Sequence, residues 1–105
     1  IVAVGFLTIL MSFNIYASDA LVWVDVRSFV EHKVDNIEGD IRISHRDIAD
    51  EATALFPTKE AKIRLYCRSG GRAGKALLAL QKAGYQDVVN VGSISNARKM
   101  RGLSD

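Results

Sequence analysis

The sequence predicts an α/β domain in which a parallel sheet of about five short strands carries helices on both faces. Segments with strand character alternate with segments with helical character from Leu21 onward, and short connections join them. This alternation is typical of parallel α/β sheets. The first strand-like segment is also a continuous apolar run, as expected for a strand that is buried on both faces.

The first twenty residues differ in composition from the rest of the chain. Residues 1–13 carry no charge, and small residues that suit signal cleavage follow at Ala17 and Ala20. An apolar run of about 7–15 residues is typical of a secretory signal, whereas a membrane span needs about 20. We therefore expect residues 1–20 to be a signal peptide and residues 21–105 to be a periplasmic domain.

Two other interpretations of residues 1–20 remain open at this point. The segment could be an uncleaved hydrophobic anchor that holds the domain to the membrane on its periplasmic side, or it could be a buried core helix. The initiator Met and a basic n-region are both absent, so we expect the sequence to be truncated at its start.

The first half of the domain contains two strand–helix units. The β-branched, apolar run Leu21–Val26 predicts a buried strand, and a short helix is expected over Arg27–Val34. Asp40–Ser44 alternates with the period of a strand. His45–Phe56 has apolar residues at helical spacing, and Pro57 is expected to end that helix.

The second half repeats this order. Ala61–Cys67 predicts a strand and Gly71–Ala83 predicts the clearest helix, with one apolar stripe and Gly84 placed as its C-terminal stop. Asp87–Val91 predicts a further strand, and Ser93–Met100 predicts a last short helix.

Charge is divided unevenly along the chain. Residues 1–57 hold four basic and nine acidic side chains, whereas residues 58–105 hold ten basic and three acidic side chains. The formal net charge is only +2, so nothing in the whole chain calls for nucleic acid. The positive second half favours anionic substrates, although a solvated basic face is the simpler interpretation.

Cys67 is the only cysteine in the chain, so no internal disulfide can form. It ends a predicted strand, at the edge of the sheet where parallel α/β domains bind ligands. The positive end of the helix that starts near Gly71 and the flanking Arg68 and Arg72 would all lower the pKa of its thiol. A thiol in this setting is a candidate nucleophile, while an inert buried cysteine is the structural alternative.

The loop after Cys67 has the composition of an anion cradle. Ser69, Gly70 and Gly71 allow the backbone to curl, so that successive N–H groups converge on one point. Glycine permits a positive φ there and lets a ligand approach the backbone closely. Cys67, with binding residues Arg68 through Arg72, is therefore the predicted site.

These motifs resemble the rhodanese family of sulfurtransferases. A strand, Cys67, a short loop to Arg72 and a helix are similar to the active-site loop of that family. The stretch Asp25–Ser44 resembles its opening motif, and Gly84–Ser93 resembles its closing strand and turn. The likeness covers Leu21–Gly102. Together with the predicted leader, the whole chain resembles the small single-domain periplasmic rhodaneses of the phage-shock type. The residues that carry the opening motif are Asp25, Val26, Arg27, Glu31 and Gly39.

The chain departs from the family pattern at a few positions outside the thiol loop. Asp35-Asn36 stands where Gly-His is common, Asp40 and Ser44 stand where Ala and Pro are common, and Gly92-Ser93 replaces a frequent Gly-Gly. These departures concern local turns and partner surfaces more than sulfur transfer.

The resemblance implies a thiosulfate sulfurtransferase. The Cys67 thiolate would take the outer sulfur of thiosulfate as a persulfide, release sulfite, and pass the sulfur to a thiol or, in vitro, to cyanide. The N–H groups from Arg68 to Arg72 would stabilise the anion, and the side chains of Arg68 and Arg72 would bind the donor. The family chemistry implies no metal and no organic cofactor. It implies no nucleic-acid partner, and a membrane contact only if residues 1–20 are retained. The sequence leaves the oligomeric state open, with a monomer expected.

Two other functions use the same strand–loop–helix arrangement. A non-enzymatic persulfide carrier or thiol sensor would need only a reactive Cys67. A cysteine-based phosphatase or arsenate reductase would need an arginine six positions after the cysteine, where this chain has Ala73, while Arg72 comes one residue early.

The remaining polar candidates favour structural roles. Asp25 and Arg27 lie at the end of the first strand and could position substrate, but the favoured interpretation is structural: an ion pair, with Glu31 at i, i+4 as the expected partner of Arg27, and hydrogen bonds that fix the strand end. His32 and His45 have no partner at a catalytic spacing and are expected to be surface or capping residues.

Overall fold

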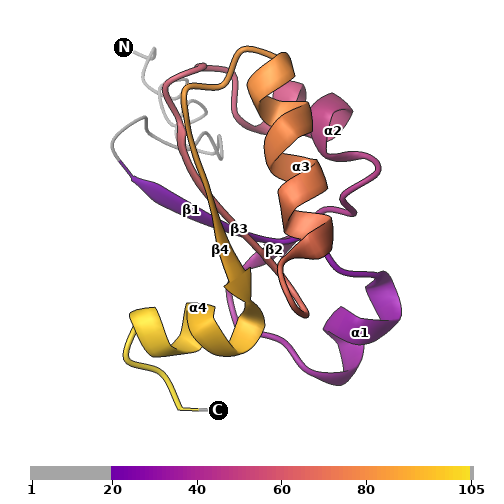
Figure 1. Ribbon diagram of the computed structural model, residues 1–105, viewed down its shortest axis with the longest axis vertical. Helices are drawn as coiled ribbons and strands as arrows, with labels where there is room; N and C mark the ends of the chain where they lie inside the picture. The colour runs from indigo at the N-terminus through magenta and orange to yellow at the C-terminus, as the bar shows by residue number, and fades with distance from the viewer. Residues whose placement is uncertain (1–19, 105) are drawn as a thin grey trace, which may run out of the picture.

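The computed structural model describes residues 20–104, which form one four-stranded parallel sheet with helices around it (Figure 1). The spatial order of the strands is β2-β1-β3-β4. The bounds of the strands are β1 Leu21–Asp25, β2 Ile41–Arg42, β3 Lys62–Cys67 and β4 Asp87–Ser93. The α/β class and the parallel sheet are confirmed. The expectation of about five strands is wrong for residues 20–104, because only four segments of this part of the chain have strand character.

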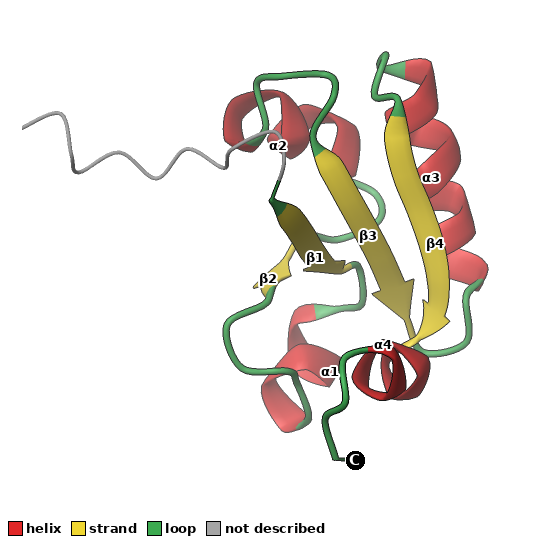
Figure 2. Cartoon of the chain, turned by 90° about the vertical axis from the view of Figure 1, so that its left-hand side faces the viewer, coloured by secondary structure: helices red, strands yellow, loops and turns green. Residues whose placement is uncertain are grey.

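The register of the sheet brings the carboxyl ends of the strands to one edge. β1 pairs with β3 from Leu21 opposite Lys62 to Asp25 opposite Tyr66. β3 pairs with β4 up to Cys67 opposite Ser93, with an irregularity between Leu65 and Tyr66. Figure 2 shows the arrowheads of β1, β3 and β4 pointing to the same end of the molecule. Cys67 therefore lies at the edge where the sequence predicts ligand binding.

Helices cover both faces of the sheet, as predicted. α2 (Ile48–Leu55) and α3 (Gly71–Lys82) pack on one face over a core of aliphatic side chains from β1 and β3. α4 (Ile94–Met100) packs on the other face, where Ile94 and Ala97 join Tyr66 and Val91 in a second cluster. Each large aliphatic side chain that is fully buried in these clusters contributes about 1.5–3 kcal/mol to folding.

α1 (Phe29–Val34) is different, because none of its residues is buried. It lies beyond the carboxyl ends of the strands, next to the start of α3 and near α4 (Figure 1). Ser28 caps it, and Ser28 and Glu31 form a reciprocal capping box. Polar contacts, described below, hold this helix in place instead of a buried apolar face.

The element bounds differ from the predicted ones where backbone turns interrupt regular structure. β2 is only two residues long instead of Asp40–Ser44: the N–H of Asp40 donates to the carbonyl of Ile37 in a turn before it, and the carbonyl of Ser44 accepts from Asp47 in a turn after it. α2 begins at Ile48 rather than His45, because the chain first makes a turn in which the N–H of Asp47 donates to Ser44.

The end of α3 agrees with the prediction. Gly84 has φ of 101°, its N–H donates to Gln81, and the N–H of Tyr85 donates to Leu80. These two bonds form a Schellman motif, which satisfies the last carbonyls of the helix. The role of Gly84 as the stop of α3 is therefore confirmed.

The predicted leader, residues 1–20, lies almost entirely outside the described residues. Within residues 20–104, no helix is long and apolar enough to cross a membrane.

Candidate active site

Cys67 is the last residue of β3, and its side chain is only 1% exposed. Its Sγ accepts a hydrogen bond from the N–H of Gly70, with 3.0 Å between the two atoms. α3, twelve residues long, begins at Gly71 and directs its N-terminal N–H groups toward the same loop. The thiol therefore lies at the positive end of a helix, as the sequence predicts.

Burial and hydrogen bonding act on the Cys67 thiol in opposite directions. Burial is the largest single influence and raises its pKa. Hydrogen bonds from backbone N–H groups together outweigh burial and hold the pKa of Cys67 below its ordinary value; these groups belong to Ala73, Gly70, Ser69 and Arg72. The stabilisation of the thiolate thus comes mainly from the backbone of the loop, whereas the sequence also suggested the charges of Arg68 and Arg72.

Gly70 shapes this loop. Its φ of 106° lies in the left-handed region, and a Cβ at this position would lie 3.5 Å from the Cα of Gly92 in β4. The positive φ turns the N–H of Gly70 toward the sulfur while the next residue enters the helix. A side chain at this position would be strained.

Asn90 in β4 fixes the loop to the sheet. Its Nδ2 donates to the carbonyl of Gly70 at 3.0 Å, and its Oδ1 accepts from the N–H of Gly92 at 2.8 Å. Asn90 is not among the site residues predicted from the sequence. The available signal was a polar side chain inside an otherwise apolar strand, two positions before a glycine.

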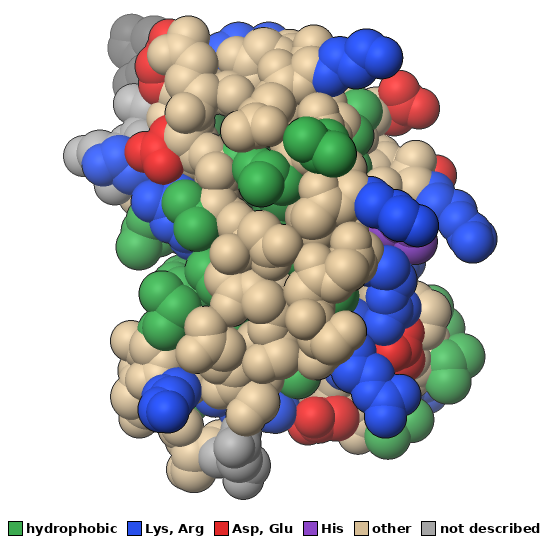
Figure 3. Space-filling view, in the orientation of Figure 1, with side chains coloured by type: hydrophobic (Ala, Val, Ile, Leu, Met, Phe, Trp, Pro, Cys, Tyr) green, Lys and Arg blue, Asp and Glu red, His purple; other side chains and the backbone are tan. Residues whose placement is uncertain are grey.

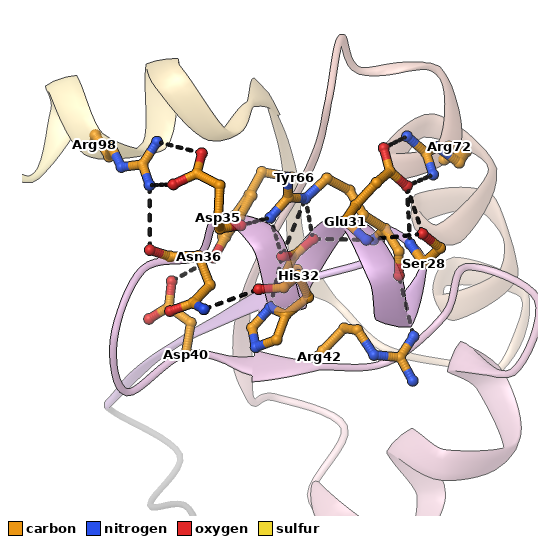
Figure 4. A network of polar contacts seen from close by, with 12 residues as sticks. Ser28, Glu31, His32, Asp35, Asn36, Asp40, Arg42, Tyr66, Arg72 and Arg98 are labelled. Atoms are coloured by element: carbon orange, nitrogen blue, oxygen red, sulfur yellow. Dashed lines mark hydrogen bonds and ion pairs between the residues drawn. The ribbon is translucent and has the colours of Figure 1, made fainter. Parts of the chain in front are cut away.

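Arg72 does not point freely into the site. Its guanidinium donates to both carboxylate oxygens of Glu31, at 2.6 and 2.9 Å (Figure 4). The hydrogen bond with Glu31 raises the pKa of Arg72, and the same bond holds the pKa of Glu31 well below its usual range. The expected ion pair between Arg27 and Glu31 is wrong, because Glu31 bonds to Arg72 instead.

Arg27 instead pairs with Asp25, and both side chains are buried. The Arg27 Nη2 lies 2.7 Å from Asp25 Oδ2, and its Nε lies 2.9 Å from Oδ1. Burial raises the pKa of Asp25, but hydrogen bonds from Arg27 and His32 hold that pKa below its ordinary value. The Nη2 of Arg27 also donates to the carbonyl of Asp35, just after α1. This pair therefore links the end of β1 to α1.

The two histidines have different surroundings. The Nδ1 of His32 lies 2.9 Å from Asp25 Oδ2, so His32 is a partner of the buried carboxylate rather than an ordinary surface residue. Burial lowers the pKa of His45, and the nearby cations Arg46, Lys75 and Arg72 lower it further. Figure 3 shows Lys and Arg side chains gathered along the right-hand edge, where α1 and the start of α3 lie in Figure 1.

The other predicted binding residues lie on the same loop. Arg68 and Ser69 are exposed, and Gly71 is the first residue of α3. Arg68 makes no hydrogen bond or ion pair to any other residue between 20 and 104. No group of three or more potential metal ligands occurs in this part of the chain. The site therefore offers a buried thiol, a ring of N–H donors and one unpaired guanidinium.

Comparisons with known proteins agree with this geometry. The model of the rhodanese-like domain family matches residues 14–99. The chain is 26% identical over 92 residues to the thiosulfate sulfurtransferase PspE of Escherichia coli, covering 88% of each protein. It is also 34% identical over 84 residues to the probable adenylyltransferase/sulfurtransferase MoeZ of Mycobacterium tuberculosis, although it spans only 21% of that protein.

Solved structures show the same fold. A structure described as a rhodanese with anions from E. coli superposes with a TM-score of 0.69 at 27% identity, covering 73% of this chain and 91% of the other. A rhodanese-like domain from Anabaena, at 24% identity, superposes with a TM-score of 0.71 over 81% of this chain and 97% of its own length. The matched family model, which spans most of the described domain, shows that this chain belongs to the rhodanese-like domain family.

Proposed function

We propose that this protein is a thiosulfate sulfurtransferase that carries sulfane sulfur as a persulfide on Cys67. One observation carries the proposal: the Cys67 Sγ lies 3.0 Å from the N–H of Gly70 at the N-terminus of α3. Several backbone N–H groups of the loop hold the pKa of Cys67 down, so the reactive thiolate forms without a separate base. The similarity to a thiosulfate sulfurtransferase of E. coli supports the choice of donor.

The reaction is a double displacement. In the first half, the Cys67 thiolate forms a bond to the outer sulfur of thiosulfate, and the S–S bond of thiosulfate breaks with its electron pair leaving on sulfite. In the second half, an acceptor takes the outer sulfur from the persulfide, and Cys67 returns to the thiolate. The loop N–H groups favour the charge on the sulfur atoms in both halves.

The side chains at the loop take separate roles in this proposal. Arg68, which has no protein partner in residues 20–104, attracts the thiosulfate dianion. Arg72 is neutralised by Glu31, so its main role is to hold the loop against α1. Asp25 and Arg27 form a buried ion pair that supports the end of β1.

Turnover of thiosulfate with cyanide tests the proposal, with Cys67→Ser beside the parent protein. Multiple turnovers in the parent and none in Cys67→Ser are expected. Transfer of a single sulfur to Cys67 without turnover would instead favour a persulfide carrier or sensor. No sulfur on Cys67 at all, in a folded protein, would contradict both functions.

We also propose that residues 1–20 direct export and that residues 21–105 form the sulfurtransferase domain in the periplasm. The support is the uncharged, apolar composition of residues 1–13 and the small residues that follow. The intact mass of the protein recovered from a periplasmic extract tests this. A recovered chain that retains the leader would contradict cleavage, and its absence from the extract would contradict export.

A further inference from the structure

A cavity of about 470 Å³, open to solvent, lies between α1 and α4, and Arg68 is the one residue of the thiol loop that lines it. This is the size of a site for an organic molecule, which typically takes 300–1,000 Å³. Thiosulfate has only five heavy atoms and would leave most of the cavity empty. The apolar residues that line the cavity are Val30 and Val34 of α1 and Ile94 of α4.

The apolar wall on α1 is unusually exposed. Val30 is 66% exposed and Val34 is 80% exposed, although the two residues are four positions apart on the same helical face. Figure 3 shows hydrophobic side chains over α1 at the lower right of the molecule. No other part of the described chain covers this face, so it is available to an apolar group of a bound molecule.

The charged residues around the cavity indicate which polar group the bound molecule carries. Arg68 is the one charged lining residue without a partner in residues 20–104. An anionic group on the ligand would complement it, and Arg68 directly follows Cys67 in the chain. The other three charged lining residues are neutralised by ion pairs: Arg27 with Asp25, Glu31 with Arg72, and Asp35 with Arg98.

We propose that this cavity binds the sulfur acceptor, and that the acceptor is a small organic thiol with an apolar chain and a carboxylate. The inference rests on the proposed function and specifies its second half. The apolar chain packs against Val30 and Val34, and the carboxylate binds Arg68. Because sulfite departs before the acceptor enters, Arg68 serves the donor and the acceptor in turn.

The transfer step balances without a further reagent. The acceptor sulfur forms a bond to the outer sulfur of the Cys67 persulfide anion. The bond between that sulfur and Cys67 Sγ breaks, and its electron pair stays on Cys67 as the thiolate. The proton of the acceptor thiol passes to the transferred sulfur, so the product is an organic persulfide.

The test measures kcat/KM of the full chain for three acceptors: mercaptoacetate, ω-mercaptohexanoate and the uncharged ω-mercaptohexanol. In a double displacement, kcat/KM for the acceptor reports only the second half-reaction. One buried methylene corresponds to about fourfold in binding. Partial burial of the longer chain is expected to raise kcat/KM about tenfold from mercaptoacetate to ω-mercaptohexanoate in the parent.

Matched variants distinguish the contribution of the cavity to kcat/KM from the intrinsic reactivity of each thiol. The double variant Val30→Ser/Val34→Ser is expected to reduce the tenfold preference for the long chain to less than about threefold. Leu78→Ser removes a side chain of 66% exposure from α3, outside the cavity lining, and is expected to keep the preference. The parent is expected to prefer ω-mercaptohexanoate over ω-mercaptohexanol, and Arg68→Gln is expected to remove that preference.

Loading of Cys67 is measured separately, by intact mass after incubation with thiosulfate or with polysulfide. If Cys67 loads normally and the preference for the long chain is absent, or is the same in Val30→Ser/Val34→Ser, the acceptor proposal is overturned while the sulfurtransferase stands. If Cys67 takes sulfur from neither reagent, both proposals fall.

Discussion

Arg72 of the thiol loop and Glu31 of α1 form a two-pronged ion pair, although they lie 41 positions apart in the sequence. The pair joins the N-terminus of α3 to a helix that buries none of its own residues. At the other end of that helix, Arg98 of α4 bonds to the Asp35 carboxylate (Figure 4). α1, which lies beside the thiol loop, is therefore held in place mainly by polar contacts.

Glu31→Ala is expected to destabilise the protein by about 1–2 kcal/mol. The change removes the ion pair with Arg72 and the capping-box bond to Ser28, and both contacts are only partly shielded from water. Urea unfolding measures the loss. Glu38→Ala is the control, since Glu38 is exposed and makes no hydrogen bond or ion pair within residues 20–104, and its effect should stay within about 0.5 kcal/mol.

The loss in Glu31→Ala should depend on pH. Because the folded protein holds the pKa of Glu31 below its ordinary 4.5, the carboxylate stabilises the fold fully above that value. Its contribution declines as the pH falls below 4.5, where the unfolded chain takes up the proton first. The difference in stability between parent and Glu31→Ala should therefore be largest near neutral pH and shrink in acid. A difference that is constant with pH would show that Glu31 does not act through its charge.

Asn90→Ala is expected to lower kcat/KM for thiosulfate about tenfold and to raise the pKa of Cys67. The amide side chain holds the carbonyl of Gly70 against β4, and a looser loop would aim its N–H groups less well at the sulfur. Alkylation rates of Cys67 as a function of pH report the pKa. Gln86→Ala removes an exposed amide from the turn before β4 and should change neither quantity; an equal effect of both variants would contradict the role of Asn90.

Gly70→Ala should destabilise the protein by roughly 1–2 kcal/mol, because an L-residue at φ of 106° is strained. Gly71→Ala serves as the stability control: nothing lies within 4 Å of a Cβ there, and alanine favours a helix more than glycine does. Thermal unfolding compares the two. Similar losses in both variants would show that the loop conformation does not depend on the positive φ of Gly70.

The thiol of Cys67 is expected to ionise at a lower pH than the thiol of N-acetylcysteine measured alongside. Backbone N–H groups are the main groups that lower its pKa, so Arg68→Gln should leave the midpoint of the alkylation profile nearly unchanged. The same variant should raise KM for thiosulfate severalfold, since it removes the unpaired cation at the site. A large upward shift of the midpoint in Arg68→Gln would assign the pKa of Cys67 to the arginine instead.

Local patterns were sufficient to predict the backbone of the site. The strand that ends at Cys67 is predicted by the apolar pattern of its own residues, although it forms by pairing with β1 and β4. The helix that follows and its stop at Gly84 depend on contacts within a few residues, which periodicity and glycine placement report directly. The short β2 was not predictable in the same way. It is defined by its pairing with β1, Val24 opposite Ile41 and Asp25 opposite Arg42, and these partners lie about 17 positions away in the sequence.

The side-chain partners were harder to predict for the same reason. The i, i+4 rule suggested Arg27 with Glu31, but that rule applies only within a helix, and Arg27 precedes the cap residue Ser28. The actual partner of Arg27 is Asp25, two positions away, whereas the pair of Glu31 with Arg72 depends on how α1 lies across the end of the sheet. No local signal in the sequence specifies that arrangement.

The most direct test of sulfur transfer by Cys67 is thiosulfate:cyanide turnover by the full chain, with the intact mass of the protein measured after thiosulfate alone. We expect one added sulfur atom on Cys67, repeated turnover once cyanide is present, and neither in Cys67→Ser. A folded parent protein that gains no sulfur and forms no thiocyanate would contradict it.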